Sequence, residues 1–145
     1  MEPIYPEELK EKIQHLFKGE ELSLVKHIGI EYIELSKDKV HARMPVDERT
    51  KQPFGLLHGG ASVVLAESLA SVGSWLNVDE SKYHVVGMEI NANHIRAMRK
   101  GEVIGTAKPL HKGQKTQVWE IDIRTPEGKL VCISRCTLAV VNRRD

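Results

Sequence analysis

The chain has 145 residues, of which 41% are hydrophobic and 28% charged, and its formal net charge is +1 at pH 7. This length and composition suit one domain, residues 1–145, with a sizeable core. The near-neutral balance gives no overall basic surface, which argues against nucleic acid as the main partner. No uninterrupted apolar run of about 18 residues occurs, and the first residues lack a basic and then apolar signal pattern. We therefore expect a cytoplasmic protein that does not enter a membrane.

Residues 1–20 are predicted to form an N-terminal helical segment. Within residues 6–17, apolar side chains recur at i, i+4, i+7 and i+8, and acidic residues occupy the first turn, which predicts a short amphipathic helix. The apolar positions are Leu9, Ile13, Leu16 and Phe17. We expect this helix to lie against the domain as a lid or flap.

Two strands are predicted next, over residues 27–35 and 39–45. In the second, Val40, Ala42 and Met44 alternate with polar residues, which is the period of a strand with one buried face. The sequence Ser-Lys-Asp between the two strands predicts a hairpin. A loop over residues 46–57 then leads to the longest apolar part of the chain.

That part is residues 52–75, QPFGLLHGGASVVLAESLASVGSW. It begins as a loop marked by proline and glycine and continues into about sixteen residues that are apolar on nearly every side, which predicts a central, buried helix. Glu67, Ser71 and Ser74 stand at i, i+4 and i+7 and therefore share one stripe of this helix. A buried carboxylate without a partner is costly. Glu67 must therefore have a partner, reach water or face a cavity.

Four further strands are predicted after the helix, separated by turns that contain glycine or proline. They cover residues 83–95, 101–110, 116–125 and 129–141. The order of one long helix between two and four strands predicts the α+β class, with an antiparallel sheet curled around one long central helix. Cys132 and Cys136 lie on one face of the last strand about 13 Å apart, too far to form a disulfide. We expect both thiols to be small core or half-buried residues.

The start of the central helix suggests a chemical role. Gly59 and Gly60 carry no side chain that could block a ligand, and the first N–H groups of a helix lack partners within it, so they can bind a developing oxyanion. His58 flanks this position. Glu67 lies eight residues after Gly59, about 12 Å along the axis. If the two act on one bond, they must come from two antiparallel copies of the helix, at a homodimer interface.

Each of these features also has a purely structural interpretation. Glycine is common at helix N-termini, and a single glutamate in an apolar run is often a structural hydrogen-bonding group. The combination favours a functional site more than either feature does alone.

The run from Gln52 to Ser71, with the later sequence VVGMEINANH at residues 85–94, resembles the hot-dog fold acyl-CoA thioesterases. The resemblance covers residues 28–141 and is greatest to the branch with the menaquinone-pathway dihydroxynaphthoyl-CoA thioesterase and the enterobactin-pathway proofreading thioesterase. It implies that Glu67 is the catalytic carboxylate, that Gly59 is the oxyanion donor, and that Ser71 helps to hold the attacking water. It also implies that Gln52 and His58 position the thioester. Members of this family are usually tetramers, which implies a homodimer that assembles into a homotetramer.

Residues 91–115 contain six lysines and arginines with one opposing glutamate, which predicts a local basic patch that could face a polyanion. Solvated strand ends would explain the same charges. The resemblance places coenzyme A in this region. The residues it implies for the pantetheine and nucleotide path are Gly87, His94, Ile95, Arg96 and Ala97, and Arg99 belongs to the basic patch beside them. The residues it implies for the phosphate loop are His111, Lys112, Gly113, Gln114, Lys115 and Thr116.

We interpret the sequence as a thioesterase that hydrolyses an acyl-CoA, or an acyl-carrier-protein thioester, to a free acid and a thiol. The resemblance favours an aryl acyl group such as dihydroxynaphthoyl or hydroxybenzoyl, in a pocket near Phe54, Leu57, Val64 and Trp75. Coenzyme A is then part of the substrate and no cofactor is expected. The scattered histidines predict no metal site. Two alternatives are a hot-dog hydroxyacyl dehydratase or hydratase and a non-catalytic acyl-CoA sensor.

Overall fold

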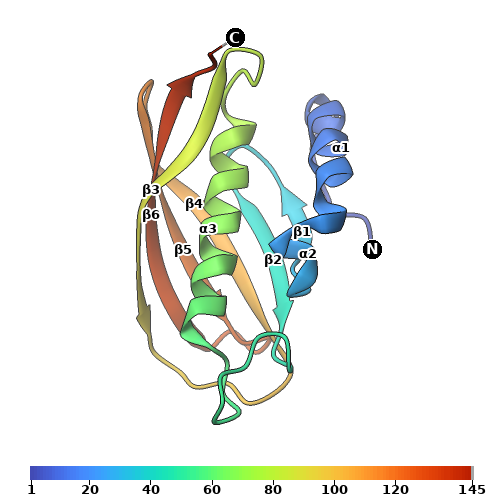
Figure 1. The fold of residues 1–145 in the computed structure, drawn as a ribbon, viewed down its shortest axis with the longest axis vertical. Helices are drawn as coiled ribbons and strands as arrows, with labels where there is room; N and C mark the ends of the chain where they lie inside the picture. Colours follow the sequence, from blue (N-terminus) through green and yellow to red (C-terminus); the bar gives the residue numbers. More distant parts are fainter. Residues whose placement is uncertain (145) are drawn as a thin grey trace.

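The computed structural model describes residues 1–144, without the side chain of Glu20, so the last residue of the predicted domain lies outside the described part. Six strands and one long helix make up most of it (Figure 1). The strands are β1 (Glu31–Leu35), β2 (Val40–Pro45), β3 (Tyr83–His94), β4 (Glu102–Lys112), β5 (Thr116–Arg124) and β6 (Leu130–Asn142). The helices are η1 (Glu7–Leu9), α1 (Lys10–Gly19), η2 (Glu20–Leu22), α2 (Leu24–His27) and α3 (Gly59–Leu76).

The strands form one antiparallel sheet in the order β1-β2-β4-β5-β6-β3. The sheet curls around α3, as Figure 1 shows, which confirms the predicted α+β architecture. β1 and β3 are the two edges. The free side of β1 is partly covered, because Ile4 forms a parallel bridge with Glu34. β3 is a long edge strand of 12 residues, with Val86 48% and Met88 62% exposed.

Apolar side chains on one face of α3 pack into the concave face of the sheet. Leu65 and Leu69 are fully buried, and they fill the space above Gly105 of β4. Trp119 of β5, also fully buried, lies against Gly73. Its indole N–H donates to the side chain of Gln117 (3.0 Å). These contacts hold α3 along its length.

The opposite face of α3 is only partly covered within one chain, contrary to the prediction of a helix buried on all sides. Gly60 is exposed, and Val64, Glu67 and Ser71 are half-buried. Ser74, from the predicted polar stripe, is fully buried, and its hydroxyl has no hydrogen-bond partner in the described part of the chain. The predicted polar stripe is therefore half-buried at Glu67 and Ser71 and fully buried at Ser74.

The N-terminal segment packs over the C-terminal end of α3. Ile13 of α1 is fully buried, which confirms the predicted amphipathic helix. The ammonium of Lys12 lies 4.6 Å from the Trp75 ring centroid and donates to the Val78 carbonyl (2.6 Å). Because these contacts anchor α1, the helix stays packed beside the C-terminal end of α3.

The first strand was predicted to start too early, at residue 27, whereas β1 begins at Glu31. Residues 27–30 do not belong to β1, because α2 (Leu24–His27) ends there and residues 28–30 connect it to β1. The Ser23 hydroxyl accepts from the Lys26 N–H and caps the start of α2. The central helix begins at Gly59 after a loop that includes residues 52–57, as predicted. Cys132 and Cys136 are buried free thiols, as predicted.

Replacing Gly73 by alanine tests the contact between α3 and the sheet. A Cβ at this position would lie 2.6 Å from Cη2 of Trp119, whose buried ring has no space to move. We expect Gly73→Ala to lower the free energy of unfolding by about 1–3 kcal/mol, measured by urea denaturation. Gly19→Ala is the matched control, because a Cβ there would meet nothing within 4 Å. Equal effects of the two substitutions would contradict this packing.

Candidate active site

His58 caps the N-terminus of α3 and accepts hydrogen bonds from most of the free backbone N–H groups of its first turn. Its ring Nδ1 accepts from the Gly60 N–H (2.8 Å), and its carbonyl accepts from the N–H groups of Ala61 (3.0 Å) and Ser62 (3.3 Å). Because Nδ1 accepts a hydrogen bond, the neutral ring carries its proton on Nε2. The exposed imidazole can therefore present an N–H donor beside the helix terminus.

The remaining donor of the first turn is the Gly59 N–H. Within residues 1–144 it has no hydrogen-bond partner. It also sits at the positive end of an 18-residue helix, where an anionic oxygen is stabilised. The sequence prediction named Gly59 for this position, and the structure leaves the donor available for a ligand.

His94, at the end of β3, lies directly over Gly59. A Cβ added to Gly59 would be 2.8 Å from His94 Nε2, so only glycine allows the imidazole to come this close. The sequence analysis placed His94 along the coenzyme A path and did not pair it with Gly59. The contact joins a strand end to a helix start 35 residues earlier in the chain, which no local pattern indicates.

Gln52 stabilises the loop that leads to the helix. Its side-chain carbonyl accepts from the N–H groups of Phe54 (2.5 Å) and Leu56 (3.4 Å). After the loop, the His58 N–H donates to the Thr50 carbonyl (2.8 Å), which brings the two ends of the loop together. The side-chain carbonyl oxygen of Gln52 thus accepts hydrogen bonds within the loop. Its amide NH2 group is the part of the side chain that could contact a substrate.

Glu67 lies on the half-covered face of α3, against the middle of β3. Its carboxylate oxygen occupies the place where a Cβ at Gly87 would stand. Burial, with the nearby charges of Glu67 and Glu89, raises the pKa of the Cys136 thiol to about 12, so this thiol stays protonated at neutral pH.

Ser71 follows one helical turn after Glu67 and is also half-buried. Because α3 is continuous from Gly59 to Leu76, Glu67 stays about 12 Å from Gly59.

The predicted coenzyme A residues fall into two groups at opposite ends of α3. Ile95, Arg96, Ala97 and Arg99 follow β3, are exposed, and lie at the Gly59 end, where the Leu57 N–H donates to the Met98 carbonyl (2.8 Å). Residues 111–116 form the β4–β5 hairpin at the other end, about 26 Å along the helix. The prediction of a single basic patch is therefore wrong for one chain, because the two groups of residues lie at opposite ends of α3. Counting charges along the sequence missed that β4 carries the chain from one end of the molecule to the other.

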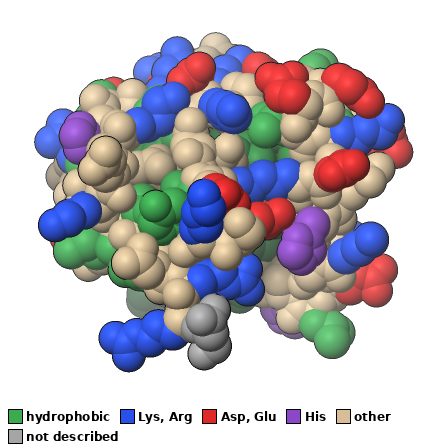
Figure 2. Space-filling view, turned by 90° about the horizontal axis from the view of Figure 1, so that it is seen from above, with side chains coloured by type: hydrophobic (Ala, Val, Ile, Leu, Met, Phe, Trp, Pro, Cys, Tyr) green, Lys and Arg blue, Asp and Glu red, His purple; other side chains and the backbone are tan. Residues whose placement is uncertain are grey.

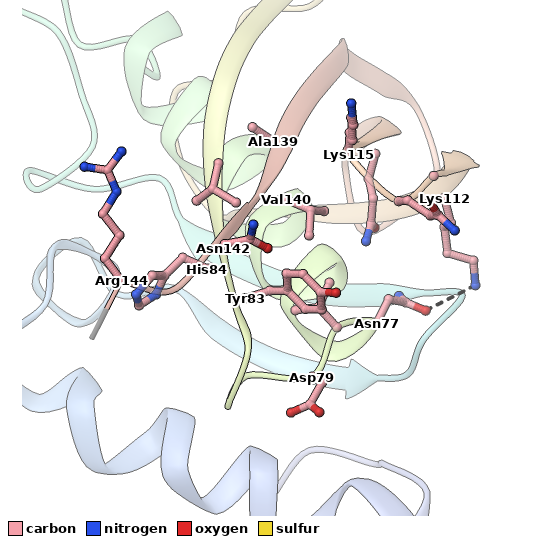
Figure 3. Close-up of a pocket in the computed structure, with 15 residues that line it drawn as sticks. Asn77, Asp79, Tyr83, His84, Lys112, Lys115, Ala139, Val140, Asn142 and Arg144 are labelled. Atoms are coloured by element: carbon pink, nitrogen blue, oxygen red, sulfur yellow. Dashed lines mark hydrogen bonds between the residues drawn. The ribbon is translucent and has the colours of Figure 1, made fainter.

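The hairpin borders a cavity of about 1290 Å³. Lys112 and Lys115 lie on one side of it, and Arg144 and His84 on the other (Figure 3). The face of the molecule at this end carries basic and acidic side chains close to one another (Figure 2). Lys112 is held by Asp38 (2.7 Å) and Asn77 (3.2 Å). The sequence analysis named Lys112 but neither of these two residues, because they come from distant segments.

Residues 113 and 116 shape the hairpin turn. The Gly113 N–H donates to the Thr116 carbonyl (2.9 Å). A Cβ at Gly113 would lie 2.5 Å from Nε2 of His111, so the imidazole rests on the turn. Gln114 is exposed at its tip.

The residues predicted for an acyl pocket do not meet within one chain. Phe54 is 84% exposed at the loop before α3, whereas Trp75 lies near the other end under Lys12. Leu57 and Val64 are half-buried between them. A pocket made of all four is excluded in a single chain.

Residues 1–144 contain no group of three histidine, cysteine or acidic side chains that could hold a metal ion. In the same range, none of the helices combines the length and hydropathy that a membrane crossing requires.

Comparison with known proteins places the chain in a family. A sequence profile of the thioesterase superfamily matches residues 54–132. The 1,4-dihydroxy-2-naphthoyl-CoA hydrolase of Escherichia coli is 53% identical over 82% of this chain and 87% of that protein. The proofreading thioesterase EntH of Cronobacter turicensis is 50% identical over 82% and 86%. A Pseudomonas aeruginosa thioesterase, crystallised as a glutamine-to-alanine variant, has a TM-score of 0.86 and 48% identity, covering 90% of this chain and 94% of that one.

The chain therefore belongs to the thioesterase superfamily, and its sheet around one long helix is the hot-dog fold. It is a hydrolase that acts on thioester bonds.

The cap at His58 can be tested separately from any catalytic role. We expect His58→Ala to lower the free energy of unfolding by about 0.5–2 kcal/mol, because the Gly60 N–H loses its acceptor. His58→Asn, which can still cap, should keep most of the stability. Denaturation curves give both values. If the two variants are equally stable, His58 does not stabilise the helix in this way.

Proposed function

We propose that the protein hydrolyses an acyl-CoA thioester at a site shared by two subunits. The observation that carries this proposal is the Gly59 N–H, the one donor of the first helical turn that His58 and the helix leave without a partner in the described chain. A donor in this position can bind the thioester oxygen as it becomes negative. Glu67 supplies the carboxylate.

The two groups reach one thioester only across a dimer. They lie about 12 Å apart on a single rigid helix, so Gly59 of one subunit must face Glu67 of its partner in an antiparallel arrangement. The exposed apolar edge of β3, with Val86 and Met88, supports this pairing, because a long free edge strand favours addition of another chain. We further propose that dimers assemble into a tetramer, as the resembled family usually does.

The same arrangement accounts for the divided coenzyme A residues. If Gly59 faces Glu67 of the partner subunit, the two-fold axis passes beside Val63. The C-terminal end of each α3 then extends about 14 Å beyond Gly59 of the other. This brings the β4–β5 hairpin of one subunit to the side where Arg96 and Arg99 of the other lie. One coenzyme A could then contact both groups.

The reaction needs only groups of the protein and water. The thioester oxygen accepts from the Gly59 N–H, and negative charge grows on it as a nucleophile attacks the carbonyl carbon. Glu67 either removes a proton from the attacking water or attacks itself to give a mixed anhydride that water then hydrolyses. In both routes the C–S bond breaks, the sulfur leaves as a thiolate and takes up a proton, and the acyl group leaves as a free acid.

The relatives support an aryl acyl group on this chain, since one of them is named for dihydroxynaphthoyl-CoA. The experiment that tests class and substrate together is a hydrolysis screen over aryl and alkyl acyl-CoAs and acyl-carrier-protein thioesters, with released thiol measured by a chromogenic reagent. Thiol release from aryl-CoA substrates is expected. A dehydratase or hydratase would act on a hydroxyacyl chain without releasing thiol, and a sensor would bind coenzyme A without turnover.

Glu67→Gln keeps the size of the side chain and removes its charge. We expect it to leave folding and coenzyme A binding intact and to lower kcat by about two to four orders of magnitude, the usual scale for loss of an acid–base group. Steady-state kinetics on the best substrate of the screen measure this. Turnover within a few-fold of the parent would exclude Glu67 from catalysis.

Subunit exchange tests the shared site. A heterodimer of Glu67→Ala and His58→Ala has one site with both lesions and one site with neither. Random mixing in equal amounts should therefore restore up to about a quarter of the parental activity. Native mass spectrometry confirms that exchange occurs. If it does and activity stays at the level of the separate variants, Glu67 and His58 of one chain serve the same site.

Substituting Arg96 and Arg99 together by alanine tests the coenzyme A path. Contacts far from the thioester hold substrate and transition state alike, so KM should rise much more than kcat changes. Increasing ionic strength should raise the parental KM in the same direction. If the double variant instead binds coenzyme A normally and loses turnover, these arginines are not on the path.

A further inference from the structure

Gly87 is the residue of β3 that Glu67 faces. Two atoms lie within 4 Å of a Cβ built at this position, and both belong to Glu67: Oε1, which the Cβ would overlap, and Cδ at 3.5 Å. The carboxylate oxygen therefore occupies the space that any other residue would fill with its side chain. A glycine inside a strand often marks such a close approach.

The backbone offers no competing reason for a glycine here. The glycines with positive φ are Gly29, Gly55, Gly101 and Gly128, so residue 87 has a conformation that alanine can adopt. Within one chain it is also exposed at an edge strand, where no core packing demands a small residue. Space for Glu67 is the remaining explanation that the contacts support.

The strand is also irregular at this point. Gly87 pairs with Leu138 and Glu89 with Thr137, so Met88 is an extra residue in β3. A bulge of this kind changes the direction of the side chains that follow it. The approach of Glu67 thus coincides with the one register shift in the pairing of β3 with β6.

We propose that Gly87 is a positioning residue for the catalytic carboxylate: its missing side chain leaves the space that holds the Glu67 carboxylate against β3, aimed at the partner subunit. This inference rests on the proposed function of Glu67. It differs from the role that the sequence resemblance implied, in which Gly87 lines the pantetheine. A glutamate has three rotatable side-chain bonds, and a close wall on one side restricts where its oxygens can lie.

The test is Gly87→Ala, alone and combined with Glu67→Asp. The added methyl group must displace the carboxylate, and a misplacement of about 1 Å can lower turnover by about 100-fold. We therefore expect Gly87→Ala to lower kcat by about 10- to 100-fold while KM changes by less than about 3-fold. Aspartate is one carbon shorter and does not reach the methyl group. In the Glu67→Asp background, the added alanine should cost at most about 2-fold.

Three controls make each outcome decisive. Unfolding curves check that Gly87→Ala is folded, and Gly19→Ala, where a new Cβ meets nothing within 4 Å, is the matched substitution. Glu67→Gln tests the proposed function separately. If Glu67→Gln is inactive and Gly87→Ala has parental kcat, the positioning role is wrong and the catalytic role stands. A rise in KM with unchanged kcat, or equal losses in both Glu67 backgrounds, would assign Gly87 to substrate binding instead.

Discussion

The rigidity of α3 is the constraint on which the rest of the structure depends. Leu65 and Leu69 bury one face in the sheet, and Trp119 holds the helix at Gly73. A helix fixed at so many points cannot bend to bring its start closer to its middle. The Gly59 N–H and the carboxylate of Glu67 therefore keep a separation of about 12 Å. A second copy of the helix is the simplest way to complete one site from these two halves.

Glycines determine where the functional side chains can lie along this helix. Gly60 leaves space for the ring of His58, Gly59 for that of His94, and Gly87 for the carboxylate of Glu67. In each case a Cβ would collide with that neighbouring side chain. The fold thus places polar groups by leaving out neighbouring side chains as much as by supplying hydrogen-bond partners.

Sequence patterns predicted the sheet and the helix well, because alternation of apolar residues and glycine-containing turns are local signals. They failed where the answer depended on distant contacts. Residues 27–30 were assigned to a strand, although a short helix capped by Ser23 ends at His27 and the strand begins only at Glu31. The basic residues between 91 and 115 were read as one patch, although β4 separates them. Glu67 and Gly59 could be named from the sequence, but the contacts of His94 with Gly59 and of Gly87 with Glu67 could not.

A crystal structure with a non-hydrolysable ketone analogue of the best acyl-CoA substrate is the most direct test of a site shared by two subunits. We expect the ketone oxygen to lie about 2.7–3.1 Å from the Gly59 nitrogen of one subunit, with Glu67 of the partner subunit beside the carbonyl carbon. A complex in which the ketone oxygen avoids the Gly59 N–H, or in which Gly59 and Glu67 of the same chain contact one ligand, would contradict it.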